Sequence, residues 1–104
     1  DADVKVKDLK EGMILMPVLN RWTRIRMAFK VVFQTDEEEN SYWSVSCDGF
    51  SRSASPNDSL AIYIGTERAD FFMNGVKKHH ILFVDGKVAR VDGYEFRWIE
   101  PASN

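Results

Sequence analysis

The segment HHILFVDGKVARVDGYEFRWIE, residues 79–100, decides the fold prediction, because it holds two Asp-Gly pairs between apolar runs. Asp-Gly favours a two-residue type I′ turn, in which both central residues take a positive φ. A turn of this type at residues 85–86 makes the flanking runs into a β-hairpin. The cross-strand pairs that follow are Val84 with Lys87, Phe83 with Val88, Leu82 with Ala89 and Ile81 with Arg90.

The second pair, Asp92-Gly93, leaves two possibilities. A second two-residue turn would continue the chain into a three-stranded meander and place Arg90 opposite Glu95. Side chains alternate along a strand, so that register gathers seven apolar residues on one face: Leu82, Val84, Ala89, Val91, Tyr94, Phe96 and Trp98. The alternative is a 3₁₀ turn at residues 93–96 followed by a brief last strand at 97–99, an ending often found in SH3-like barrels.

Residues 24–34 show the clearest period-two pattern in the chain and predict one long strand with one face on the core. The apolar face holds Ile25, Met27, Phe29, Val31 and Phe33, and the other holds Arg24, Arg26, Ala28, Lys30, Val32 and Gln34. The four acids of residues 36–39 then predict a hairpin loop. Residues 41–47 resume the alternation with Trp43, Val45 and Cys47 inward.

The rest of the chain adds short strands and turns. We expect strands at residues 4–7, 13–16 and 60–64, the last closed by Gly65, and a surface loop at residues 48–59. Residues 66–78 could hold a helical turn near 67–72 or a short strand at 71–73. The prediction is an all-β protein: a small SH3-like barrel or compact antiparallel sandwich of six or seven strands with at most one helical turn. Residues 1–104 then form a single β-barrel-like domain.

Composition narrows the function classes. The net charge of −2 and the pI near 5.6 lack the overall basic character of most nucleic-acid-binding domains. Cys47 is the one cysteine, which excludes an intrachain disulfide and fits a reducing compartment. We therefore expect a cytoplasmic protein, or one of the virion or host cytoplasm if a phage encodes it. No apolar run approaches the ~18–20 residues of a membrane span, so no membrane partner is expected.

The chemistry-bearing residues do not form a catalytic pattern. His79 and His80 are adjacent on a strand and point to opposite faces, so they cannot chelate one metal ion. Cys47 or a serine such as Ser51 or Ser53 would need a base within hydrogen-bond reach, and no nucleophile motif surrounds them. We expect no catalytic residue, no metal and no cofactor, and hence a non-enzymatic protein.

Two binding hypotheses remain. A basic and aromatic strand face is formed by Arg21, Trp22, Arg24, Arg26 and Lys30. Small barrels bind single-stranded nucleic acid with such faces, since arginines hold phosphates and an aromatic ring stacks on bases; the alternative is an ordinary solvated strand face. The other hypothesis is protein partnership or self-association through large exposed aromatics, for which Tyr42, Tyr63, Phe71 and Phe72 are candidates. We favour a binding or assembly module with a protein partner, and nucleic-acid binding is the second choice.

Four segments resemble, in order and spacing, small uncharacterised β-barrel proteins of marine tailed phages. They are VKVKDLKEGM (4–13), IYIGT (62–66), ILFVDGKVARVD (81–92) and FRWIE (96–100). The resemblance implies a viral or environmental source, and we expect a module of bacterial or phage origin. It covers strands and turns at both ends of the chain and implies no activity.

Overall fold

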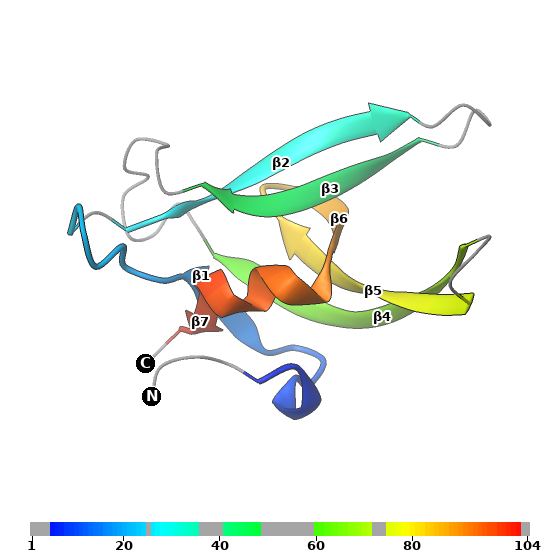
Figure 1. Ribbon diagram of the computed structural model, residues 1–104, viewed down its shortest axis with the longest axis horizontal. Coiled ribbons are helices and arrows are strands. Elements are labelled where there is room, and N and C mark those ends of the chain that lie inside the picture. Colours follow the sequence, from blue (N-terminus) through cyan, green and yellow to red (C-terminus); the bar gives the residue numbers. More distant parts are fainter. Residues whose placement is uncertain (1–4, 25, 36–40, 49–59, 72–74, 103–104) are drawn as a thin grey trace.

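Seven strands in one mixed sheet form the computed structural model, which describes residues 5–24, 26–35, 41–48, 60–71 and 75–102 (Figure 1). The strands are β1 (Ile14–Pro17), β2 (Ala28–Thr35), β3 (Ser41–Asp48), β4 (Ala61–Phe71), β5 (Gly75–Val84), β6 (Lys87–Val91) and β7 (Ile99–Pro101). Their order is β2-β3-β6-β5-β4-β1-β7, and only β3 and β6 pair in parallel. The predicted all-β class and strand number are confirmed. Within the described residues no helix is long and apolar enough to cross a membrane.

The β5–β6 hairpin forms as the Asp-Gly signal predicts. Asp85 and Gly86 take positive φ values of 54° and 74°, which a type I′ turn requires. The register from Val84 opposite Lys87 to Ile81 opposite Arg90 is the predicted one. This hairpin is therefore set by local turn chemistry.

The second Asp-Gly pair does not make a turn between strands, so the three-stranded meander is wrong. Residues Gly93–Trp98 form a 3₁₀ helix, η2, which the Glu95 N–H starts by donating to the Asp92 carbonyl at 3.0 Å. The last strand β7 pairs with β1 instead of β6. The alternative prediction, a 3₁₀ turn before a brief last strand, is correct in kind, although the strand begins two residues later than expected.

This change of path also alters the predicted Arg90–Glu95 contact and the predicted burial of Tyr94. The Nε of Arg90 donates to Glu67 Oε2 at 2.7 Å, so Arg90 does not pair with Glu95. Glu95 is buried and accepts the Cys47 N–H at 3.3 Å. Phe96 still joins the core, while Tyr94 is exposed because the 3₁₀ helix turns its side chain outward.

Strand β2 begins at Ala28, four residues later than predicted. Arg24 has a positive φ of 63° and closes a turn, and Met27 and Ala28 are both buried, which breaks the alternation. From Ala28 onward β2 pairs with β3 as the predicted hairpin. Ile25 and the acidic loop of residues 36–40 lie outside the described residues.

Residues 66–71 and 75–78 belong to the long β4–β5 hairpin. Of the two alternatives for residues 66–78, a helical turn or a strand, the strand is therefore correct. Gly65 does not close β4 but interrupts its register as a bulge with φ 147°. Residues Val6–Asp8 form a second 3₁₀ helix, η1, where a strand was expected, because Asp8 N–H donates back to the Lys5 carbonyl at 2.8 Å. Two 3₁₀ helices are thus present where at most one helical turn was predicted. The predicted loop at 48–59 lies outside the described residues except for Asp48, the last residue of β3.

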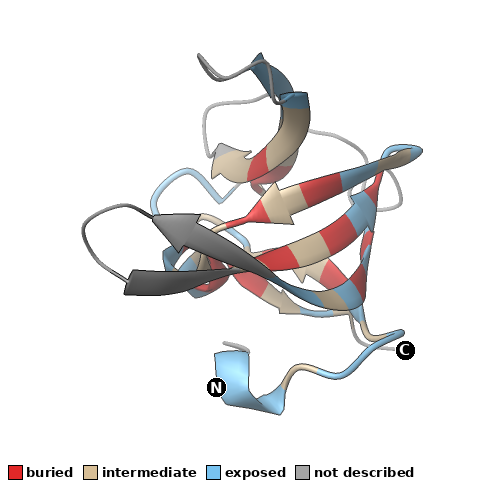
Figure 2. Ribbon diagram, turned by 90° about the vertical axis from the view of Figure 1, so that its right-hand side faces the viewer, coloured by how far each residue is buried: buried red, intermediate tan, exposed pale blue. Residues whose placement is uncertain are grey.

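The sheet curls so that its two ends meet. Leu19, just after β1, forms a bridge with Arg26, just before β2, and the Met27 N–H donates to the Val18 carbonyl at 3.1 Å. Figure 1 shows the β2–β3 hairpin at the top, β4 and β5 at the bottom, and η2 running directly into β7. Buried and exposed residues alternate along the central strands (Figure 2). The enclosed core contains Leu15, Val45, Ala61, Tyr63, Leu82, Val84, Ala89, Val91, Phe96 and Ile99.

We predict that Gly86→Ala destabilises the protein by about 1 kcal/mol, because a Cβ is strained at positive φ. Thermal or urea unfolding measures the effect. Gly93→Ala is the matched control, since Gly93 lacks a positive φ and its added Cβ would meet His80 at an ordinary 3.7 Å. Equal destabilisation by both variants would contradict the turn assignment.

Candidate ligand-binding cleft

A fixed turn at residues 20–24 projects from the end of the curled sheet. The side-chain oxygen of Asn20 accepts the backbone N–H groups of Trp22 at 2.8 Å and Thr23 at 3.0 Å. The Arg24 N–H donates to the Asn20 carbonyl at 2.9 Å. Asn side chains stabilise turns in this way. The turn therefore fixes its own backbone by local hydrogen bonds.

Arg26 connects the base of this turn to β1 and β7. Its Nη1 donates to the Pro17 carbonyl at 2.8 Å and lies 3.3 Å from Glu100 Oε1. Both side chains are largely shielded from solvent. Arg26 is thus occupied by the protein itself, and we assign it a structural role.

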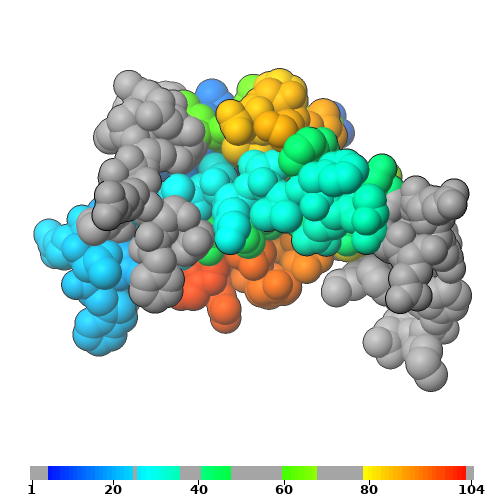
Figure 3. Space-filling model, turned by 90° about the horizontal axis from the view of Figure 1, so that it is seen from above, coloured from blue at the N-terminus to red at the C-terminus, as the bar shows by residue number. Residues whose placement is uncertain are grey.

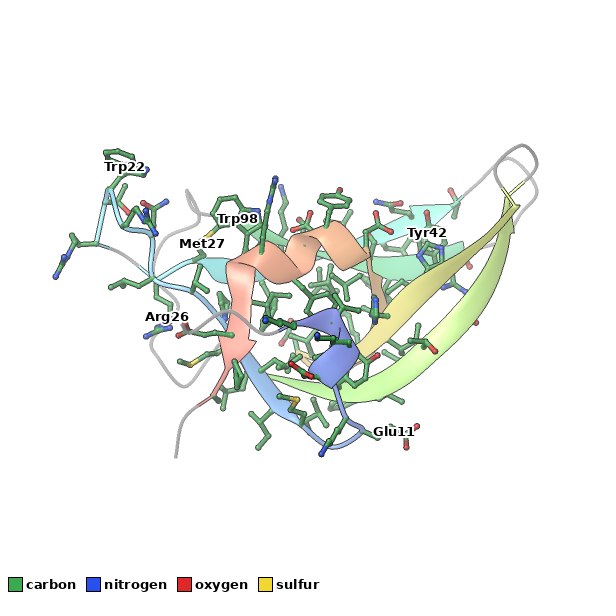
Figure 4. The ribbon with its side chains drawn as sticks, turned by 60° about the horizontal axis from the view of Figure 1, so that its bottom comes forward. Glu11, Trp22, Arg26, Met27, Tyr42 and Trp98 are labelled. Atoms are coloured by element: carbon green, nitrogen blue, oxygen red, sulfur yellow. The ribbon has the colours of Figure 1, made fainter. Side chains whose placement is uncertain are left out.

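Trp22 stands at the outer end of the turn, and its side chain is 88% exposed (Figure 4). A cleft of about 560 Å³ separates the turn from η2 and the start of β7. Its lining combines two indoles and two guanidinium groups with a few neighbours: Val18, Leu19, Asn20, Arg21, Trp22, Arg97, Trp98 and Glu100. We call this space the Trp22–Trp98 cleft. In Figure 3 the light-blue segment that carries Trp22 projects from the left end of the molecule.

On the η2 side of the cleft, a guanidinium group lies over an aromatic ring. The guanidinium of Arg97 lies 4.9 Å from the centre of the Trp98 ring and 6.0 Å from that of Tyr94. Arg97 and Tyr94 are both exposed. Stacking on rings leaves the N–H groups of a guanidinium able to donate in the plane. This side of the cleft can therefore offer both a π surface and hydrogen-bond donors to an anion.

The structure divides the residues predicted to share one basic strand face. Arg21 and Trp22 line the cleft, and Arg24 is exposed at the end of the same turn. Arg26 is held at the base, and Lys30 lies on β2 beside a different cleft. The single strand face does not form, because the chain turns at Arg24 before β2 begins.

Sequence reasoning missed Arg97 and Trp98. Their spacing from Tyr94 in the segment GYEFRW was visible, but we expected a strand that placed Trp98 in the core. In a 3₁₀ helix residues three apart lie on the same side, which brings Tyr94 and Arg97 together. The basic and aromatic residues just before a short last strand were the available signal.

The second cleft, of about 480 Å³, lies between the β2–β3 hairpin and the β5–β6 strands and has a mixed lining. Lys30 and Arg90 meet Asp92 and Glu95 there. Arg90 also packs over the Tyr42 ring at 4.8 Å while it pairs with Glu67. Because both acids and bases line it, this cleft favours no charge class of ligand.

The two histidines have separate surroundings, as the strand argument predicts. His79 lies 3.4 Å from Asp92, whereas His80 is buried and its Nδ1 is 3.0 Å from the Tyr63 hydroxyl. His80 is thus not a surface residue, and Tyr63, expected among exposed aromatics, is also buried. Tyr42 is half-buried, and the side chains of Phe71 and Phe72 lie outside the description. Over the described part of the chain, no three His, Cys, Asp or Glu residues gather as a metal site.

Cys47 is held as a neutral thiol. Burial, with the nearby Glu95 carboxylate as a second cause, raises the pKa of Cys47 from 9.0 to about 12. The thiolate is the nucleophilic form of cysteine. At neutral pH Cys47 therefore acts as a packing residue.

The chain matches no protein-family model, no curated protein and no solved structure. The function is accordingly inferred from the geometry of the Trp22–Trp98 cleft.

Native Cys47 should react with iodoacetamide about a thousandfold more slowly than the urea-unfolded protein at pH 8, because three pKa units separate the two thiols. Mass spectrometry of the alkylated chain measures the rates. Comparable rates in the folded and unfolded states would show that the thiol is accessible and ionised.

The Glu67–Arg90 pair should make stability depend on acid. The hydrogen bond from Arg90 lowers the pKa of Glu67 from 4.5, so its stabilisation is present above that pH and is lost as the pH falls through the lowered pKa. Glu67→Gln should cost about 0.2–1 kcal/mol at pH 7, the range of exposed pairs, and this difference should vanish in acid. Urea unfolding at several pH values measures it; a difference that grows in acid would contradict the pairing.

Proposed function

We propose that this protein is a non-enzymatic binding module that holds single-stranded nucleic acid in the Trp22–Trp98 cleft. Bases stack on the two indoles, and the guanidinium groups of Arg21 and Arg97 bind the phosphates. This combination of aromatic platforms and cations is the general means of binding single strands without reading their sequence.

The observation that carries the proposal is the 88% exposure of Trp22 on a turn that is rigidly hydrogen-bonded. A large aromatic side chain in water contributes nothing to the core, and exposed aromatics of this kind usually mark binding surfaces. The Asn20 turn orders the backbone beneath Trp22 before any ligand arrives. Less conformational entropy is therefore lost on binding.

Local charge favours an anionic ligand in spite of the acidic pI. The net charge is −2, and the four acids of residues 36–39 account for −4 of it, so the remaining chain carries +2. The exposed cations that line the cleft are Arg21 and Arg97, and Arg24 is exposed at the end of the same turn. Glu100, the acid in the lining, is neutralised by Arg26 at 3.3 Å. A phosphate in the cleft would meet a positive field.

The neutral thiol of Cys47 supports a function that needs no nucleophile. We further propose an SH3-like barrel, since a 3₁₀ helix precedes a short last strand that pairs with the first one. The order β7-β1-β4-β5-β6 then forms the barrel, and the β2–β3 hairpin is a long insertion after the first strand. A cytoplasmic protein of phage or bacterial origin, as the phage resemblance implies, completes this proposal.

Binding should appear as salt-sensitive quenching of tryptophan fluorescence by a short oligodeoxythymidylate. Trp22→Ala should weaken binding by about 5–150-fold, the equivalent of one lost base stack. Arg97→Glu should weaken binding and also reduce its salt dependence, because the variant makes fewer phosphate contacts and so releases fewer counterions. Trp22→Ala should leave the unfolding midpoint unchanged, since the side chain has few packing contacts.

Lys30→Glu is the matched control. It makes the same charge change as Arg97→Glu on an exposed residue that lines the other cleft, and its affinity should stay within about twofold of the wild type. If Lys30→Glu weakened binding as much as Arg97→Glu, the strand-face hypothesis would be preferred to the cleft. Absence of binding at low salt, or full binding by Trp22→Ala, would reject the proposal.

A further inference from the structure

Glu100 lines the Trp22–Trp98 cleft but has no part in the phosphate contacts proposed for it. Its side chain is 16% exposed, whereas the two arginines of the lining, Arg21 and Arg97, are open to solvent. A carboxylate repels phosphate and accepts hydrogen bonds from N–H groups. In a cleft that holds a nucleotide, this side chain is therefore suited to the base.

The Glu100 carboxylate is held in place and still has acceptor sites to offer. The Nη1 of Arg26 donates to its Oε1 at 3.3 Å, and the same nitrogen is anchored on the Pro17 carbonyl at 2.8 Å. A carboxylate has about four lone-pair sites, of which this contact uses one. Arg26 thus fixes the carboxylate and offsets its charge without exhausting its hydrogen-bonding capacity.

The backbone places this carboxylate beside the Trp98 ring. Ile99, between the two residues, is extended with φ −125° and ψ 138°, and its own side chain is fully buried. Side chains alternate along extended chain, so those of Trp98 and Glu100 leave the backbone on the same side, about 7 Å apart. Both line the cleft. A base lying on the Trp98 side of the cleft thus has one edge within reach of the carboxylate.

We propose that Glu100 makes the cleft select guanine, an inference that rests on the proposed binding of single-stranded nucleic acid there. The Watson–Crick edge of guanine carries two adjacent donors, N1–H and the N2 amino group, which match the two oxygens of a carboxylate. Adenine and cytosine present one amino group beside a ring-nitrogen lone pair, which repels the carboxylate. Thymine and uracil present one N–H between two carbonyl oxygens. Guanine is the base that satisfies Glu100 fully.

Hydrogen bonds to an ionised and largely shielded acceptor are strong, and a wrong base leaves that acceptor facing a lone pair. A good bidentate contact to a base discriminates by about 5–150-fold. Arginine also recognises guanine, through O6 and N7 on its other edge. The guanidinium groups of Arg21 and Arg97 make this the competing explanation of any guanine preference.

Base analogues test the inference on the wild-type protein by fluorescence titration. The probes are short oligodeoxythymidylates with one central guanine, adenine or cytosine, and guanine should bind about tenfold more tightly than the others. Hypoxanthine lacks the N2 amino group and should lose most of this gain. The analogue 7-deazaguanine keeps the Watson–Crick edge and should bind as guanine does. Equal affinity for all bases, or loss of the preference with 7-deazaguanine, would overturn the role of Glu100.

Glu100→Gln should abolish the guanine preference, because an amide N–H₂ then faces one of the guanine donors. Affinity for the all-thymine strand should stay within about twofold of the wild type, since the phosphate contacts are kept. Glu67→Gln is the matched control, because it also removes a carboxylate paired with an arginine, Arg90 at 2.7 Å, outside the cleft. Its guanine preference should be unchanged.

A guanine preference that survives Glu100→Gln, or that is lost equally in Glu67→Gln, would overturn the inference. Should Glu100→Gln fail to fold, the analogue series on the wild type decides alone. Binding of the all-thymine strand without any base preference rejects the selection of guanine and leaves the proposed function standing. Absence of binding by every strand rejects both.

Discussion

Two backbone hydrogen bonds at Val18 connect the end of β1 to η2 and to the segment before β2, and the rest of the structure depends on this connection. The Val18 N–H donates to the Trp98 carbonyl at 2.9 Å, and its carbonyl accepts the Met27 N–H at 3.1 Å. Val18 thus ties the end of β1 to the end of η2 and to the approach of β2. These bonds curl the sheet, fix where η2 ends, and set the distance between the turn that carries Trp22 and the helix that carries Trp98. Because they are backbone bonds, they tolerate changes of side chain at all three positions.

Elements fixed by interactions between residues close in the sequence could be predicted, and elements fixed by distant residues could not. The β5–β6 hairpin was predictable to the residue, since Asp85 and Gly86 specify the turn and the turn specifies the register. The path after Asp92 was not predictable, because Asp92-Gly93 gives the same local signal and a distant partner decides the outcome. In the folded protein Phe96 gains a place in the core, and residues 99–101 pair with β1. Neither gain is visible in the local sequence.

The residues of the candidate site also differ in how far the local sequence could predict them. Arg21 and Trp22 could be selected from the sequence, since a cation and a large aromatic were adjacent in a polar stretch. Arg26 could not be separated from them, because its partners Pro17 and Glu100 are 9 and 74 residues away. Arg97 and Trp98 were hidden by the assumption of a strand. The predicted alternation in residues 24–34 holds only from Phe29 to Val32: Ala28, predicted outward, is buried, and Phe33, predicted on the core face, is 54% exposed. A positive φ at Arg24 is not encoded by any glycine.

The Asn20 turn has a consequence for how this protein could change. Its hydrogen bonds involve the side chain of Asn20 and backbone groups of Trp22, Thr23 and Arg24, and the side chains of Arg21 and Trp22 take no part in them. Residues at positions 21 and 22 can therefore be exchanged at little cost to folding while the surface they present changes completely. Positions 21 and 22 thus present an exchangeable surface on a fixed backbone turn, and libraries randomised at these two positions would keep the fold while changing the side chains displayed.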